Sequence, residues 1–223
     1  MAAVAARHLR CDHKAFRAVT PATGADSRVL TGGLLDMVTA LAGAATAVVL
    51  FRVVKRQSET LALGFVASRL LEAAVISIGV VSLFAVVTLR QDLAGTAGAE
   101  AASLVPVGAA LVAVYEWTFL FGPNVMAAVN ALLLGTLMYR SGLVPRAIPL
   151  MGLIGGPLLL VSVTGIVFGT HGLDSGVHVI AAAPIFVWEL SLGVWLVVKG
   201  FRSSPITAGD MPSVEPPGDL FRA

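Results

Sequence analysis

Long apolar runs alternate with short polar segments along most of the chain. Each run is about as long as, or longer than, the roughly 20 residues that a helix needs to cross a bilayer. The pattern therefore predicts an all-α integral membrane bundle with five main crossings. We expect them at residues 30–54, 61–89, 112–139, 148–168 and 177–198.

One apolar run, residues 101–139, is too long for one crossing and too short for two crossings with a turn between them. Pro106 and the pair Gly122-Pro123 interrupt it, and such residues mark bends and helix ends. We interpret the run as a helix near 101–110 on the outer membrane surface, followed by the third crossing with a kink near Pro123.

Two segments fall outside the predicted helical domain, which covers residues 30–202. Residues 1–29 are basic and Ala-rich, and they contain no apolar run of the length that a signal peptide requires. We expect this segment to be weakly ordered. Residues 203–223 are rich in proline and have no apolar run, a composition typical of a disordered tail.

Composition supports the membrane assignment. The chain is 57% hydrophobic and only 13% charged, with a mean hydropathy of +0.89, whereas soluble domains are about a quarter charged. The net charge is only +2, and the basic residues lie at the ends of the apolar runs. This distribution indicates a lipid bilayer, and not nucleic acid, as the partner. Cys11 is the single cysteine, so no internal disulfide can form.

The basic residues between the apolar runs predict the orientation. Most of them fall in loops on one side, which the positive-inside rule places in the cytoplasm together with the C-terminus. We therefore expect a multi-pass plasma membrane protein. Five crossings would leave the basic N-terminus outside, which suggests either that a first crossing is missing or that the true start of the chain lies elsewhere. The loop residues on the cytoplasmic side are Arg52, Lys55, Arg56, Arg140, Arg146, Lys199 and Arg202.

Polar residues inside the predicted crossings can be placed by depth, because an α-helix rises about 1.5 Å per residue. Four of them lie about 13–18 Å from the cytoplasmic ends of their helices, near the middle of an apolar core about 30 Å thick. We expect them to form a midplane polar cluster of Arg69, Glu72, Asn130 and Glu189. Three others lie nearer the outer face and could line an outer vestibule: Asp36, Glu116 and Asn124.

Arg69 is the only basic residue at the midplane depth, and Glu72 follows it by one helical turn. Because an unpaired charge in the bilayer centre costs about 3 kcal/mol, these charges need partners. Either Arg69 bridges Glu72 and Glu189, or one glutamate is protonated. The cluster could fix helix packing, or it could be a proton- or ligand-responsive site. A third alternative is that the charged groups reach the interface and leave the midplane.

Other possible sites are less well supported by the sequence. His171, Asp174 and His178 have a spacing that could bind zinc on a helix, but Gly172 and Gly176 argue against a helix there. No histidine lies well inside a crossing, which argues against haem. The serines of the crossings show no histidine partner in sequence, and no nucleotide-binding loop is present. We therefore predict no metal, cofactor or catalytic residue.

Small residues suggest close helix packing in the fourth crossing. Gly152 and Gly156 form a small-xxx-small pair, the spacing that lets two membrane helices approach each other closely.

Three stretches together resemble the bacterial domain-of-unknown-function 4386 family, a group of small multispanning membrane proteins usually interpreted as having six crossings. They are Arg69-Leu70-Leu71-Glu72, Tyr139 to Arg146 (YRSGLVPR), and Trp188-Glu189-Leu190 continuing to Lys199-Gly200. The resemblance covers roughly residues 30–202. It supports a membrane helical bundle and implies no activity, substrate or cofactor. The chain departs from the family in lacking an apolar first crossing.

Two functions are consistent with these features. The leading hypothesis is a non-enzymatic membrane protein with a structural, sensory or assembly role, in which the midplane cluster fixes helix packing. Its partner would be another membrane protein or a second copy of the chain. The alternative is a small proton-linked transporter or channel-like protein that uses Glu72 and Glu189. A continuous cavity from the outer face to Glu72 would favour the alternative, and a closed, dry bundle the first.

Overall fold

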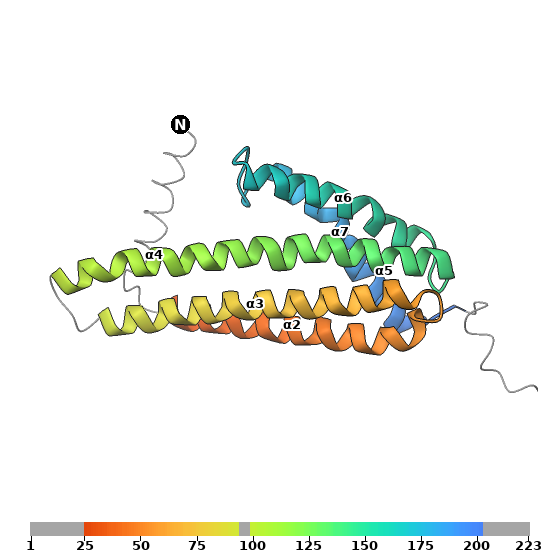
Figure 1. Ribbon diagram of the computed structural model, residues 1–223, viewed down its shortest axis with the longest axis horizontal. Helices are drawn as coiled ribbons and strands as arrows, with labels where there is room; N and C mark the ends of the chain where they lie inside the picture. The colour runs from red at the N-terminus through yellow and green to blue at the C-terminus, as the bar shows by residue number, and fades with distance from the viewer. Residues whose placement is uncertain (1–24, 94–98, 203–223) are drawn as a thin grey trace, which may run out of the picture.

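The computed structural model describes residues 25–93 and 99–202, and in this part of the chain every regular element is helical. Five helices are long and apolar enough to cross a membrane, as predicted. The segment predicted to be weakly ordered, residues 1–29, overlaps helix α2, which begins at Ala25. Its residues 1–24 and the predicted tail from residue 203 lie outside the described residues. Figure 1 shows the helices of the bundle, which are α2 (Ala25–Val54), α3 (Glu59–Leu93), α4 (Ala99–Phe119), η1 (Leu120–Met126), α5 (Ala127–Ser141), α6 (Ala147–Val167) and α7 (Gly176–Val198).

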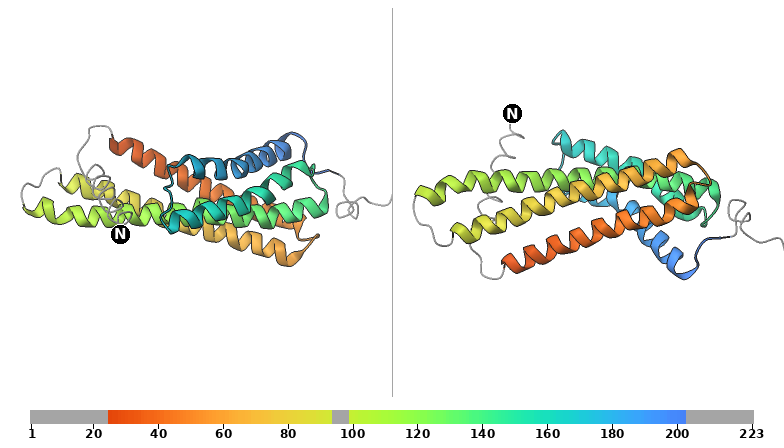
Figure 2. Two further views of the ribbon diagram at one scale, coloured as in Figure 1. Left: turned by 90° about the horizontal axis from the view of Figure 1, so that it is seen from above. Right: turned by 60° about the horizontal axis from the view of Figure 1, so that its bottom comes forward.

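The bundle consists of two helical hairpins joined by one long rod. Helices α2 and α3 form the first hairpin, α6 and α7 form the second, and α4, η1 and α5 follow one another without a break. Helix α3 packs against α2, α4, η1 and α5, and is therefore the central helix. Figures 1 and 2 show that α3 and α4 extend well beyond the α6–α7 hairpin at one end.

The long rod differs from the predicted surface helix near 101–110. Helix α4 continues through Pro106, and one candidate span runs from Leu104 to Ser141. Proline removes one backbone hydrogen bond from a helix. A membrane helix tolerates this loss when neighbouring groups satisfy the free carbonyl. At about 1.5 Å per residue, the 38 residues of this span are nearly twice as long as an apolar core of about 30 Å. The rod therefore has to tilt strongly or project from the bilayer.

The predicted irregularity at Pro123 takes the form of a π-helix. Pro123 has no N–H to donate to the carbonyl of Phe119, and the side chain of Asn124 takes over this role, with Nδ2 donating to Phe119 O over 2.9 Å. Gly122 in the same segment lies against α3, where an added Cβ would come within 3.2 Å of Ile76. The π-helix thus places Asn124 at the centre of the bundle.

All three basic loops lie at the same end of the bundle, as the ribbon in Figure 1 shows. At this end α5 finishes at Gly142, whose φ of 69° is the left-handed conformation that glycine adopts easily. The backbone N–H of Arg202 donates to Leu143 O over 2.8 Å and joins the chain after α7 to the α5–α6 loop. At the other end Arg90 Nη1 lies 3.2 Å from Asp26 Oδ1 and links α3 to α2.

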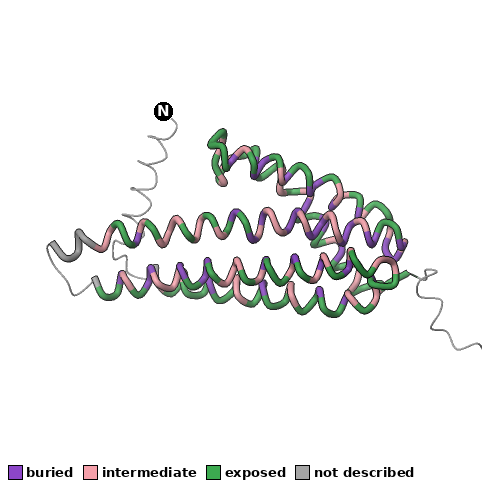
Figure 3. The backbone as a smooth tube through the Cα atoms, viewed as in Figure 1, coloured by how far each residue is buried: buried purple, intermediate pink, exposed green. Residues whose placement is uncertain are grey.

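The apolar core is concentrated near the basic end, where α2, α3, α5, α6 and α7 meet. Phe65, Leu137 and Trp188 are among its fully buried side chains. Exposed positions recur along all the helices (Figure 3), and many of them carry apolar side chains, such as Val161 and Val197. An apolar surface of this extent fits a lipid bilayer as the surrounding solvent.

Candidate functional site

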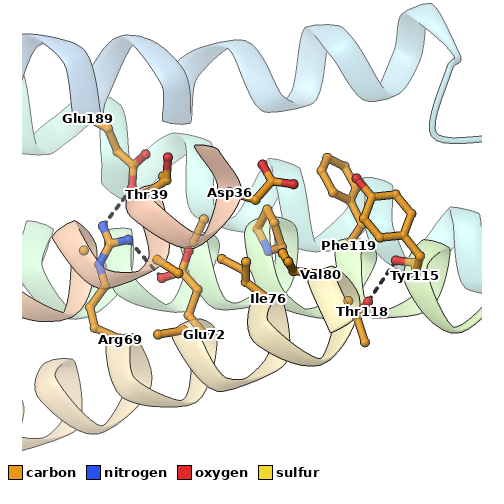
Figure 4. Close-up of a pocket in the computed structure, with 16 residues that line it drawn as sticks. Asp36, Thr39, Arg69, Glu72, Ile76, Val80, Tyr115, Thr118, Phe119 and Glu189 are labelled. Atoms are coloured by element: carbon orange, nitrogen blue, oxygen red, sulfur yellow. Dashed lines mark hydrogen bonds and ion pairs between the residues drawn. The ribbon is translucent and has the colours of Figure 1, made fainter. Parts of the chain in front are cut away.

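The four residues of the predicted midplane cluster lie together in the structure. Arg69 Nη1 is 2.9 Å from Glu72 Oε2 on the same helix, and Arg69 Nη2 is 2.8 Å from Glu189 Oε1 on α7. Asn130 on α5 donates from Nδ2 to Glu72 Oε2 over 2.7 Å. Arg69 thus contacts both glutamates, the geometry that the bridging alternative expects (Figure 4).

The cluster is closed on one side and open on the other. Glu72 on α3 and Asn130 on α5 are buried, whereas the side chain of Glu189 is 43% exposed and that of Arg69 is 19% exposed. Gly43 on α2 lies beside the guanidinium, because an added Cβ would be in ordinary contact with Arg69 Nη1 at 3.7 Å. Asn130 Oδ1 is buried and has no hydrogen-bond partner in the described part of the chain. The ion pairs are therefore accessible from the α7 side.

A cavity of about 240 Å³ begins at this cluster and extends along the bundle between α2, α3, α4 and α7. Arg69, Glu72 and Glu189 lie at one end of it, Tyr115 lies at the other, and Asp36 lies between them on the side of Tyr115 (Figure 4). Its walls are mostly apolar, with Ala40, Ala73, Ile76, Val80, Pro123 and Ala127 among the lining residues. Three carboxylates and one guanidinium thus share a single space within the predicted spans.

The three residues predicted for an outer vestibule are separated in the structure. Asp36 lines the cavity, but its lining includes neither Glu116 nor Asn124. Asn124 is buried and its side chain bonds to His178 on α7. Glu116 is half-buried on α4. The vestibule is therefore completed by residues that the sequence did not single out, Tyr115, Thr118 and Thr39.

A second polar cluster connects α6, α7 and η1, and sequence reasoning missed it. Ser162 Oγ lies 3.1 Å from His171 Nε2 and 3.1 Å from His178 Nδ1, and His178 Nε2 lies 3.1 Å from Asn124 Oδ1. The statement that the membrane serines have no histidine partner was wrong. Ser162 and His178 lie on either side of the α6–α7 loop, so the antiparallel hairpin brings together residues that spacing alone does not connect.

The directions of these hydrogen bonds follow from Asn124. Because its Nδ2 donates to Phe119 O, its Oδ1 faces His178, and the hydrogen of that imidazole is assigned to Nε2. His178 Nδ1 then accepts from the Ser162 hydroxyl, whose oxygen also lies within hydrogen-bond distance of His171 Nε2. Ser162 and His178 are buried, and the cavity lining does not include Ser162. This geometry fits a structural network better than a nucleophile, which needs access to substrate.

The described residues offer no metal site of the kind considered from sequence. No group of three or more His, Cys, Asp or Glu side chains is placed to hold a metal ion in the ranges 25–93 and 99–202. His171, Asp174 and His178 thus do not form a three-ligand set.

Close packing at the predicted glycines is confirmed. An added Cβ at Gly152 would come within 2.8 Å of the Trp188 ring, and one at Gly156 within 3.0 Å of Leu132. Gly155 between them lies equally close to Pro184 on α7. The absence of side chains here lets α6 pack closely against both α5 and α7.

The family model described as "Domain of unknown function (DUF4386)" matches residues 2–200 of the chain. The match starts well before α2, so it includes the N-terminal segment that sequence reasoning had left outside the resemblance. No curated protein and no solved structure matches the chain.

Proposed function

The chain belongs to the DUF4386 family of proteins with a domain of unknown function, and we propose that it is a small, non-enzymatic, proton-linked transporter of the plasma membrane. The observation that carries this proposal is the cavity that joins Asp36 to the Arg69–Glu72–Glu189 cluster. Ionisable groups inside membrane spans are costly, and those that face a cavity commonly mark a solute or proton pathway. A charge cluster used only for packing would be expected in a closed, dry site.

Glu189 is the group best placed to exchange a proton with the cavity. Its carboxylate is much more exposed than that of Glu72, and the contact with Arg69 is the ion pair that joins α7 to α3. Protonation would remove the negative charge and weaken that contact. Glu72 would still receive hydrogen bonds from Arg69 and Asn130. Proton binding at Glu189 would thus loosen α7 while the α3–α5 part of the cluster stays intact.

A second candidate is the packing role, in a structural, sensory or assembly protein. The observation that favours it is that the cluster joins three helices, with Arg69 and Glu72 on α3, Asn130 on α5 and Glu189 on α7. The exposed apolar faces would then bind another membrane protein or a second copy of the chain.

Proton flux in proteoliposomes distinguishes the two functions. The purified protein is reconstituted with an internal pH dye, and a pH gradient is imposed. Wild-type protein should dissipate the gradient faster than protein-free liposomes, and Glu189→Gln and Glu72→Gln should abolish the excess. Glu116→Gln is the matched control, because it removes one carboxylate outside the cavity lining. If wild-type liposomes behave like protein-free ones, transport is contradicted and the packing role is favoured.

A further inference from the structure

Asp36 is a carboxylate in the cavity that has no ionic partner among the described residues. It lies on α2 within a predicted span, is half-buried, and forms no hydrogen bond or ion pair with the described residues. The carboxylates at the other end of the cavity share Arg69. An unpaired carboxylate in a membrane span costs about 3 kcal/mol. A positive charge bound in the cavity would offset this cost.

Two threonine hydroxyls near Asp36 can act only as hydrogen-bond acceptors toward a ligand, whereas the Tyr115 phenol can also donate. Thr39 Oγ1 donates its hydrogen to Leu35 O over 2.9 Å, and Thr118 Oγ1 donates to carbonyls of its own helix. Both hydroxyl oxygens therefore retain lone pairs but have no hydrogen left to donate to a ligand. Arg69, the one cation in the lining, already contacts two carboxylates. Apart from the Tyr115 phenol and the paired Arg69, the lining thus offers acceptors and negative charge, which fits a ligand that donates and is positively charged.

The aromatic and apolar residues at the outer end of the cavity favour one type of cation. Tyr115 and Phe119 line it side by side, with ring centroids 6.2 Å apart (Figure 4), and aromatic faces attract ammonium groups. The neighbouring walls, Ile76 and Val80, are apolar. A bare Mg²⁺ or Ca²⁺ needs about six or more oxygen ligands, whereas an ammonium group with an apolar body matches one carboxylate, aromatic rings and aliphatic walls.

We propose that the cavity binds a small organic ammonium ion, with the charged nitrogen between Asp36 and the Tyr115 and Phe119 rings and the apolar body against Ile76 and Val80. The cavity of about 240 Å³ lies below the roughly 300–1,000 Å³ of drug-sized pockets, so the ligand is small. This inference rests on the proposed function, for which it supplies the substrate class. The bound cation and the proton-exchanging Glu189 would occupy opposite ends of one cavity.

Binding of benzylammonium to the full-length protein in lipid nanodiscs tests this site. Isothermal titration at neutral pH is compared with benzyl alcohol, a neutral analogue of similar shape, and heat from empty nanodiscs is subtracted. We expect saturable binding of benzylammonium and none of the alcohol. Asp36→Asn should weaken binding by at least about tenfold, the typical effect of losing a hydrogen bond to a charged group. Glu116→Gln, which removes a carboxylate outside the lining, should leave the affinity unchanged.

A second variant covers the case in which Asp36→Asn does not fold. Tyr115→Leu keeps the carboxylate but removes one aromatic ring, and it should weaken benzylammonium binding several-fold while binding remains detectable. Equal binding of the alcohol, full affinity in Asp36→Asn, or no binding to the wild type would each overturn the proposal. Glu189-dependent proton flux without ammonium binding would overturn the substrate class alone. Loss of both signals would overturn the proposed function as well.

Discussion

Arg69 on α3 and Glu189 on α7 are 120 positions apart in the chain, yet Nη2 of one lies 2.8 Å from Oε1 of the other. The same guanidinium contacts Glu72 through its other terminal nitrogen. Arg69 is mostly buried and Glu189 is open to the cavity. Arg69 therefore forms a stable ion pair with Glu72 and a more exposed one with Glu189. This asymmetry underlies both the stability and the proton exchange expected of the cluster.

Removing Arg69 should destabilise the protein strongly. Arg69→Met leaves Glu72 buried without its cation, and breaking such a buried pair typically costs about 3–5 kcal/mol. Glu72→Gln should cost less than Arg69→Met, because Arg69 keeps its contact with Glu189. The measurement is the free energy of unfolding in detergent for wild type, both single variants and the double variant.

The double variant, Arg69→Met with Glu72→Gln, shows whether the two substitutions affect the free energy of unfolding together or independently. If Arg69 and Glu72 act as a pair, the double variant should recover much of the loss caused by Arg69→Met. Additive losses would contradict the direct pairing. A stabilising Glu72→Gln would instead indicate a charge retained for function at a cost to stability.

Ser162 should contribute to the stability of the fold through its contacts with His171 and His178. Ser162→Ala leaves His178 Nδ1 without its hydrogen bond in a buried site, and an unsatisfied buried group costs about 1–3 kcal/mol. Thr164→Ala is the control on the same helix, because its hydroxyl is exposed and bonds only to Leu160 O. It should change the unfolding free energy by less than about 0.5 kcal/mol. Equal effects of the two variants would argue against the Ser162 network.

Gly152 should not tolerate even one methyl group. An alanine Cβ would lie 2.8 Å from Trp188, which is only 2% exposed and cannot move aside easily. Such overpacking costs about 1–3 kcal/mol. Gly193→Ala on α7 has no heavy atom within 4 Å of its new Cβ, so it should be neutral or stabilise its helix by up to about 1 kcal/mol. Thermal unfolding of the two variants in one detergent tests this contrast.

The sequence predicted the crossings because an apolar run of bilayer length has few alternatives to a membrane helix. Helix rise converts residue number into depth in the membrane. The sequence could therefore place four polar residues at a similar depth: Arg69, Glu72, Asn130 and Glu189. Depth does not specify direction, however. Asn124 lies near the middle of the unbroken α4–η1–α5 span, and its side chain bonds to His178 and does not line the cavity.

Other features depend on tertiary structure that sequence patterns do not show. The unbroken path of α4 through Pro106 could not be predicted, because proline ends some helices and is tolerated in others. The contact between Ser162 and His178 requires the α6–α7 hairpin to close with one particular register. The cavity likewise forms from side chains of several helices and has no signature in any one of them.

The central claim is that an acidic cavity inside the spans is open to water as far as the Arg69–Glu72–Glu189 cluster. The most direct measurement is thiol labelling of Thr39→Cys in proteoliposomes, in a background with Cys11→Ser. Thr39 lines the cavity, whereas the adjacent Val38 is an exposed apolar residue outside the cavity lining. We expect a cationic, water-soluble methanethiosulfonate to label Thr39→Cys faster than an anionic one does and to leave Val38→Cys unlabelled. Failure to label Thr39→Cys, or equal labelling of both positions, would contradict the account.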